Sequence, residues 1–273
     1  MTPEHEGPGG GAFPWSGGQA GPGPGASPGE AGLRPRPLLA RVVGVIVEPV
    51  RTMREAAERP AGLATLAFLV FFGLLTGVVM WFRLDFAEMI RDQLEKAHVS
   101  LPPAARESAM SGIAVLVQKI ILCIVIPAVG LPLAALVSAL VLWGISRIVS
   151  ARGEFRQHFS VVAHAWIPAV VIGGLAVSAL LLARGGSGMD IQNPIPSNPA
   201  WFLPEDASPF ARTFLMIPDL FSVWIVVLLV IGVGAAARLS RGAAAAVVLS
   251  PWLLLKVAGA LVGGFALKTQ LGG

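Results

Sequence analysis

The stretch that decides the fold is residues 120–145, IILCIVIPAVGLPLAALVSALVLWGI, which contains no charged side chain. The hydrocarbon core of a bilayer is about 30 Å thick, so a helix needs about 20 apolar residues to cross it. Four further apolar runs of this kind occupy residues 61–82, 159–183, 217–237 and 243–266. The sequence therefore predicts an all-α, polytopic membrane bundle with five transmembrane helices, contained in a single membrane domain, residues 61–266.

The composition favours the same class of protein. Hydrophobic residues make up 55% of the chain and charged residues 13%, and the mean hydropathy is +0.73. A soluble domain carries about 25% charged residues. The single cysteine, Cys123, lies inside the second run, so no intrachain disulfide and no cysteine metal cluster are expected. We find no phosphate loop, hydrolase elbow or paired carboxylate in a span, and therefore expect no catalytic, cofactor or metal site.

The segments that flank the predicted membrane domain differ from it. Residues 1–37 are rich in glycine and proline and predict a disordered tail. Residues 38–60 repeat apolar side chains at helical spacing, with charges largely on the other side, which predicts an amphipathic interfacial helix that Pro49 kinks or divides. An alternative is that this apolar face packs on the bundle and not on lipid. Residues 267–273 form a short tail.

Arginines and lysines are distributed unevenly among the connections. The segment before the first run and the short connections after the second and fourth runs carry Arg34, Arg36, Arg41, Arg51, Arg54, Arg59, Arg147, Arg152, Arg156, Arg238 and Arg241. On the other side, the long connection 83–119 balances its cations with acids. The positive-inside rule then predicts a cytoplasmic amino terminus, with the tail 1–37 inside, and a carboxyl terminus on the outer side.

Three polar side chains within the runs are candidates for intramembrane contacts. Lys256 lies deep in the fifth run, where an ionised lysine is costly unless it is paired. The long side chain of Lys256 can reach Asp219 at the outer end of the fourth run, which predicts a Lys256–Asp219 contact. In the alternative, Lys256 extends to the outer surface and Asp219 caps the fourth helix. His164 suits a packed, hydrogen-bonded role or, alternatively, a proton or metal role.

Small residues and prolines point to close packing and bending of the helices. Gly73 and Gly77 in the first run, and Gly259 and Gly263 in the fifth, have the spacing at which helices approach closely. Candidate kinks are Pro127, Pro132, Pro168 and Pro251. The proline-rich connection 184–216 also carries many apolar side chains, which suggests a lid folded on the outer end of the bundle; a loosely ordered loop is the alternative.

Two segments resemble a known family. They are GEFRQHF (residues 153–159) with VVAHAWIP (residues 161–168), and DLFSVW (residues 219–224) at the start of the fourth span. With the order of lead-in, amphipathic stretch and five spans, the chain resembles bacterial members of the Yip (Ypt/Rab-interacting protein) family over about residues 38–266. The resemblance implies a non-enzymatic integral membrane protein. Eukaryotic members act in vesicle traffic with Rab-type GTPases at the cytoplasmic side.

Two functions follow as expectations. The first is an adaptor or organiser of membrane or of membrane-protein partners, with cytoplasmic contacts through residues 38–60, 147–158 and 238–242. The second is a transporter or channel-like subunit that uses the kinked helices with Lys256, Asp219 and His164. The expected partners are the lipid bilayer and other membrane proteins or a second copy of the chain, with no nucleic acid and no small-molecule substrate inferred. The alanine- and glycine-rich composition suggests a bacterial inner membrane.

Overall fold

The computed structural model describes residues 36–96, 102–187, 189, 194–204, 207, 211, 214–216, 219–254 and 257. The chain divides into two compact units, residues 1–36 and 37–273, and all the helices described below belong to the second unit. Residues 1–35, most of the predicted disordered tail, lie outside the described residues. So do Lys256, Gly259, Gly263 and the predicted outer tail 267–273.

Every regular element in the described part of the chain is a helix, and four helical stretches are long and apolar enough to cross a membrane. The first is α3 (Gly62–Arg83). The second, Gly112–Ile148, joins α6 (Gly112–Ile120), η1 (Ile121–Gly130) and α7 (Leu131–Ile148). The third, Phe155–Arg184, joins α8 (Phe155–Ala165), η2 (Pro168–Gly173) and α9 (Gly174–Arg184), and the fourth is α11 (Leu220–Ala237). These stretches correspond to the first four predicted spans.

The fifth predicted span, residues 243–266, is described only in its first part. A helix runs over Arg241–Leu254 and is apolar, but it is shorter than a span as far as it is described. Most of the remainder of the predicted span lies beyond the described residues. The fifth span therefore stays a prediction.

The predicted helix over residues 38–60 is two helices, α1 (Leu38–Val47) and α2 (Pro49–Glu58), which meet at Glu48. Proline lacks an N–H and has a fixed φ, so Pro49 suits the first position of a new helix and ends the previous one. On α2, Met53 and Ala56 are completely buried, and the helix packs on α8 and α11. On α1, Leu39 and Val47 remain 67% and 69% exposed. The bundle-packing alternative thus describes α2, whereas α1 keeps an exposed apolar side.

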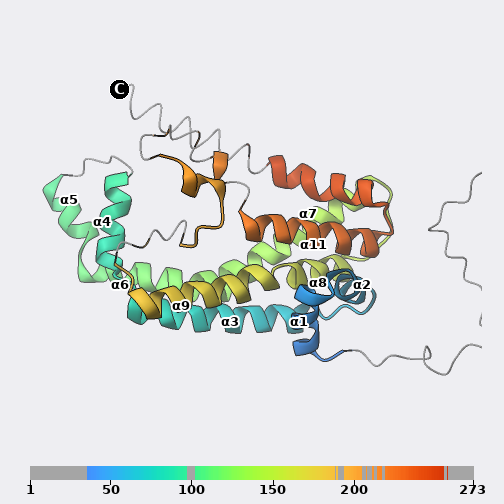
Figure 1. Ribbon diagram of the computed structural model, residues 1–273, viewed down its shortest axis with the longest axis horizontal. Helices are drawn as coiled ribbons and strands as arrows, with labels where there is room; N and C mark the ends of the chain where they lie inside the picture. Colours follow the sequence, from blue (N-terminus) through green and yellow to red (C-terminus); the bar gives the residue numbers. More distant parts are fainter. Residues whose placement is uncertain are drawn as a thin grey trace, which may run out of the picture. The chain divides into compact units, whose positions relative to one another are not determined.

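Hydrogen bonds between distant segments define how the long helices run. At one end of the bundle, the Ala61 N–H donates to the Ser160 hydroxyl (3.2 Å) and the Arg152 N–H donates to the Ala237 carbonyl (3.2 Å). At the other end, Arg83 Nε donates to the Leu181 carbonyl (3.2 Å). The first and third spanning stretches are therefore parallel, and α7 and α11 run in the opposite direction. Figure 1 shows α1 and α2 at one end of the bundle and α4–α6 at the other.

The end away from α1 and α2 has its own small core. Helix α4 (Phe86–Lys96) follows α3 and contributes Phe86 and Met89 to a cluster with Leu84, Cys123 and Leu181. The short helix α5 (Pro103–Ala109) precedes α6. The larger core lies toward α1 and α2, where α2, α3, α7, α8 and α11 meet.

The connection after α9 is partly described. It contains the 3-10 turn η3 (Pro199–Phe202), whose first residue follows Asn198. The Asn198 side chain accepts a hydrogen bond from the Ala200 N–H (3.1 Å), and Asn198 and Ala200 are buried. The Ser197 carbonyl accepts from the Leu220 N–H at the start of α11 (2.9 Å). The Ser197–Leu220 bond attaches this short segment to the start of α11, and the lid over residues 184–216 stays a prediction.

Candidate functional site

A buried ion pair fastens α1 to α2 at one end of the bundle. Arg41 Nη2 lies 3.1 Å from Glu55 Oε1, and the two side chains are 6% and 15% exposed. Arg41 Nη1 also donates to the Arg59 carbonyl (3.1 Å), which begins the connection to α3. One guanidinium therefore joins α1, α2 and the entry to the first span. A planar, forked donor suits such a multiple contact.

Near this pair, His164 on α8 lies fully buried and faces α3. Its Nδ1 is 2.7 Å from the Ser160 carbonyl, which can only accept, so Nδ1 carries a proton. Its Nε2 is 3.2 Å from the Thr65 hydroxyl. The Ser160 hydroxyl in turn accepts from the Ala61 N–H. His164 thus links two spans through hydrogen bonds and is shielded from solvent.

His158 repeats this arrangement one turn and a half earlier on α8. Its Nδ1 is 3.0 Å from the carbonyl of Glu154, again the residue four positions before the histidine. Its Nε2 is 3.2 Å from the Ser146 hydroxyl on α7. The two histidines are six residues apart and bond different neighbouring helices, His164 with α3 and His158 with α7. We call Arg41, Glu55, Thr65, Ser146, His158, Ser160 and His164 the polar layer.

The polar layer is a fixed scaffold. In the part of the chain that the structure describes, no buried side-chain nitrogen or oxygen lacks a hydrogen-bond partner. The described residues also contain no group of three or more histidine, cysteine, aspartate or glutamate side chains able to hold a metal ion. A satisfied, buried network of this kind fixes how helices pack, because breaking it leaves polar groups without partners.

Three segments far apart in sequence, which also carry part of the polar layer, meet at the same end of the bundle. Residues 38–60, 147–158 and 238–242, which we call the end face, are joined by the α2 contacts with α8 and α11 and by the Arg152–Ala237 hydrogen bond. The end face holds nine arginines and four glutamates, a formal charge of +5. Ile148 is 82% exposed there, and the Arg51 side chain 56%.

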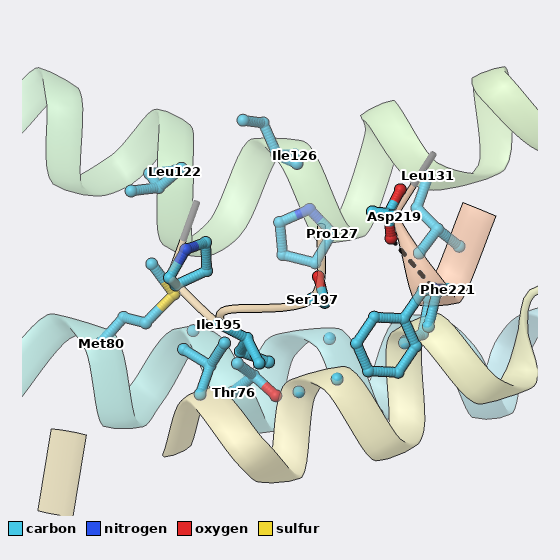
Figure 2. A pocket seen from close by; sticks show the side chains of 18 of the residues that line it. Thr76, Met80, Leu122, Ile126, Pro127, Leu131, Ile195, Ser197, Asp219 and Phe221 are labelled. Atoms are coloured by element: carbon cyan, nitrogen blue, oxygen red, sulfur yellow. Dashed lines mark hydrogen bonds between the residues drawn. The ribbon is translucent and has the colours of Figure 1, made fainter. Parts of the chain in front are cut away.

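A second candidate site is a cavity of about 650 Å³ in the half of the bundle away from α1 and α2. Its walls come from α3, η1, η2, the start of α9 and the 194–221 stretch (Figure 2). The walls are mainly apolar, with Leu122, Pro127, Val170, Val177 and Phe221 among the lining residues. The polar groups on its border belong to Thr76, Ser197, Asn198 and Asp219.

Proline and glycine produce this cavity. Pro127 lies inside η1 and Pro168 begins η2, and both stretches are π-helical. A proline cannot donate to the helical ladder, which favours such widened turns, and π-helical turns are frequent at functional sites. Gly73 and Gly77 on α3 face η1, where a Cβ at Gly77 would overlap the Cys123 carbonyl. The backbones of α3 and η1 touch at Gly77, and the glycines that line the cavity contribute no side chain to fill it.

The Asp219 side chain caps α11 at the border of the cavity. Its Oδ1 accepts from the N–H groups of Phe221 (3.0 Å) and Ser222 (3.1 Å), and its Oδ2 accepts from the Ser222 hydroxyl. This capping role is the predicted alternative to a Lys256 contact. Lys256 lies outside the described residues, so the contact itself stays a prediction.

The other predicted residues divide between the two regions. Pro127, Pro168, Gly73 and Gly77 surround or adjoin the cavity, whereas His164 is absent from the described residues that line it. Pro132 lies at the start of α7 and Pro251 within the helix Arg241–Leu254, both in regular α-helix. The transporter hypothesis grouped His164 with Asp219, but the structure places His164 in the polar layer instead.

Sequence reasoning missed the ion pair Arg41–Glu55 and the hydroxyl partners of both histidines. One signal was available, because Arg41 shares a helical face with the buried Val45 and therefore points toward the bundle. A second signal, for where α8 begins, was Glu154 with Gln157, which form a capping box there. The polar border of the cavity gave no such signal, since Ser197 and Asn198 lie in a connection.

Comparison with known families gives one result. The family model described as the Yip1 domain matches residues 43–262. The match includes all four membrane-spanning stretches, the cavity and every residue of the polar layer except Arg41. No curated protein and no solved structure matches the chain.

Proposed function

Since this chain belongs to the Yip1 domain family and carries several helices able to span a membrane, we propose that it is a non-enzymatic adaptor or organiser. In this proposal it lies in the plasma membrane of a bacterium with its amino terminus and end face in the cytoplasm and its carboxyl terminus outside. Its partners are other membrane proteins, or a second copy of the chain, that contact the end face.

The observation that carries the proposal is that the end face is a single ordered surface. Its three segments are joined by the packing of α2 on α8 and α11 and by the Arg152–Ala237 hydrogen bond, and the Arg41–Glu55 ion pair holds α1 to α2 within the first segment. A net positive surface with exposed apolar side chains is suited to acidic protein segments and anionic lipid head groups. The positive charge also supports the cytoplasmic orientation.

Site-specific photo-crosslinking in cells tests this proposal. A photoreactive amino acid is placed at Ile148 or at Val47, both exposed on the end face, and at Phe202, which is 90% exposed in the connection after α9. We expect the same discrete protein adduct from Ile148 and Val47 and none from Phe202. Replacing Arg152 and Arg156 by glutamine should reduce that adduct about tenfold, because complementary charge is removed.

Two results would contradict the adaptor role. One is labelling of lipid alone at both end-face positions. The other is a set of protein adducts from Phe202 that equals the set from Ile148. Asp219→Asn, a substitution at the border of the cavity, serves as the matched control and should leave the adducts unchanged.

One observation favours a second candidate, a transporter or channel-like subunit. The cavity adjoins two π-helical turns and a carboxylate, which is typical of helices that are interrupted around a site. Because His164 does not line the cavity, this version relies on Asp219 and Lys256 alone. It predicts solute flux in liposomes that is lost in Lys256→Met. Absence of flux in the purified wild-type protein would remove this candidate.

A further inference from the structure

We propose that the cavity binds the ammonium group of a membrane-partitioned amphiphile at Asp219, with the hydrocarbon chain of the ligand against the apolar wall. This site goes beyond the adaptor role, because it uses no residue of the end face. The class of ligand follows from the volume, the charge and the depth of the cavity.

The volume and the lining suit a small amphiphile. About 650 Å³ falls within the range of small-molecule pockets, about 300–1,000 Å³. Most of the apolar lining residues come from the spanning stretches, whereas three of the four described polar lining residues, Ser197, Asn198 and Asp219, come from the 194–221 stretch and the fourth, Thr76, from α3 (Figure 2). A mainly apolar lining with a few polar groups and, among the described residues, a single carboxylate matches a ligand that has a chain and a polar head.

The charge of the border selects the head group. Asp219 is the one charged side chain among the described residues that line the cavity, and none of those residues is basic. The donors among the described residues that reach the carboxylate are two backbone N–H groups and the Ser222 hydroxyl, and these are neutral. A carboxylate has about four lone-pair sites, so Asp219 can accept further hydrogen bonds. An anionic head group would meet a like charge, because Asp219 already occupies the N-terminus of α11.

The depth of Asp219 selects a ligand that enters from the bilayer. This depth follows from Phe221, two residues after Asp219. The Phe221 ring lies 3.7 Å from the place of a Cβ on Gly173, and the next residue, Gly174, adjoins Thr76 of α3. Thr76 is seven residues before the end of α3, about 10 Å along the helix axis. A carboxylate near this level is costly in lipid unless a cation or water accompanies it. A ligand that supplies an ammonium group at that level removes the penalty.

Photolabelling of the full chain in phosphatidylcholine nanodiscs tests the site. Three probes carry the same photoreactive dodecyl chain and differ only in the head group: an amine, a carboxylic acid and an alcohol. We expect saturable labelling of the cavity walls by the amine, with an affinity about tenfold above that for the acid and the alcohol. Ala169→Phe, which fills the cavity, should abolish labelling by all three probes.

Asp219→Asn tests the carboxylate and keeps the helix cap, because asparagine is an equally good N-cap residue. It should lower the affinity for the amine about tenfold and leave the alcohol unchanged. Asp85→Asn is the matched control. The Asp85 Oδ1 caps α4 in the same way, accepting from the Ala87 and Glu88 N–H groups, but Asp85 does not line the cavity.

Equal labelling by the three probes in both the wild-type chain and Lys256→Met, or an affinity for the amine that Asp219→Asn leaves unchanged in both, would overturn the proposal. Lys256 would compete for Asp219 if the predicted contact forms, so the amine is measured in the Lys256→Met variant as well. A lack of amine preference in both backgrounds overturns the site. Competition by phosphatidylethanolamine in the nanodisc would identify the ligand as a lipid head group, and its failure would identify a free amine; either result requires the amine-selective site.

Discussion

Helix α3 passes two regions that differ in packing although they lie on one continuous helix. Near its start, Thr65 is fully buried and bonds His164 across the bundle. Thr76 lies eleven residues later, about 16 Å along the axis, and borders the cavity. Its hydroxyl donates a hydrogen bond to the Phe72 carbonyl of its own helix. The first region fixes how helices sit together, whereas the second leaves volume and an acidic group for a ligand.

The comparison teaches that polar residues in a membrane bundle serve different purposes according to what surrounds them. The polar layer encloses an ion pair and two histidines and satisfies them internally, so it stabilises the fold. Asp219 has neutral donors and an open side, so it is suited to binding. Matched substitutions in the two regions test this distinction.

The largest expected effect is at the buried ion pair. Arg41→Met removes the guanidinium from Glu55, whose side chain is only 15% exposed, and should lower the free energy of unfolding by about 3–5 kcal/mol. Arg51→Met is the control, because Arg51 and Glu48 form a pair at 3.2 Å that is half exposed and should contribute at most about 1 kcal/mol. Equilibrium unfolding in detergent micelles measures both.

Two outcomes bear on the role of Arg41. If α1 and α2 depend on it, limited proteolysis should cleave between residues 38 and 60 faster in Arg41→Met than in Arg51→Met. The double variant Arg41→Met/Glu55→Leu should recover part of the lost stability, because no buried charge then remains. Equal effects of the two single substitutions would contradict the distinction between buried and exposed pairs.

The next effect comes from adding one methyl group in each region. In Gly232→Ala, the Cβ would overlap Val161 and come within 2.8 Å of Met53 Cε, so we expect a loss of about 1–3 kcal/mol. In Gly173→Ala, the Cβ meets the Phe221 ring at 3.7 Å, an ordinary contact. That variant should be neutral or stabilised by up to about 1 kcal/mol, since alanine is the better helix former. Comparable losses of melting temperature would show that the cavity region is packed as tightly as the core.

The smallest effect distinguishes the two threonines. Thr65→Val removes the hydroxyl partner of His164 Nε2 and should lower stability by about 1–3 kcal/mol, because a buried nitrogen loses its partner. Thr76→Val removes only a bond to the same helix and should change stability by less than about 1 kcal/mol. Thermal unfolding of the two variants in the same detergent compares them, and a larger loss in Thr76→Val would reverse the assignment of the regions.

The sequence predicted those features that depend on local pattern. The four described spans follow from apolar runs, although the helices extend beyond them. Lys119 lies about two turns into Gly112–Ile148 and Gln157 in the first turn of Phe155–Arg184, and hydropathy is a poor guide to helical residues of this kind. The division at Pro49 follows from proline stereochemistry. The fifth span and the Lys256–Asp219 contact stay predictions, because most of that region lies outside the described residues.

Features that depend on how distant segments meet were beyond the sequence. The Arg41–Glu55 pair forms because α1 folds back beside α2, and Thr65 meets His164 because α3 and α8 are parallel neighbours. The cavity requires Gly73, Pro127 and Gly173, from three separate spans, to line the same volume. Each residue had a local interpretation, as a packing glycine or a kink, but the volume they enclose is a property of their arrangement.

Accessibility of single cysteines tests the central claim most directly, namely that the bundle crosses the membrane with the end face in the cytoplasm. In a Cys123→Ala background, cysteine replaces Gly242 on the end face, where an added Cβ has no neighbour within 4 Å, or the exposed Ser108 in α5. We predict that a membrane-impermeant maleimide added outside intact cells labels Ser108→Cys only, and that it labels Gly242→Cys only in inverted vesicles. Labelling of both cysteines from one side, or the reverse pattern, would contradict the account.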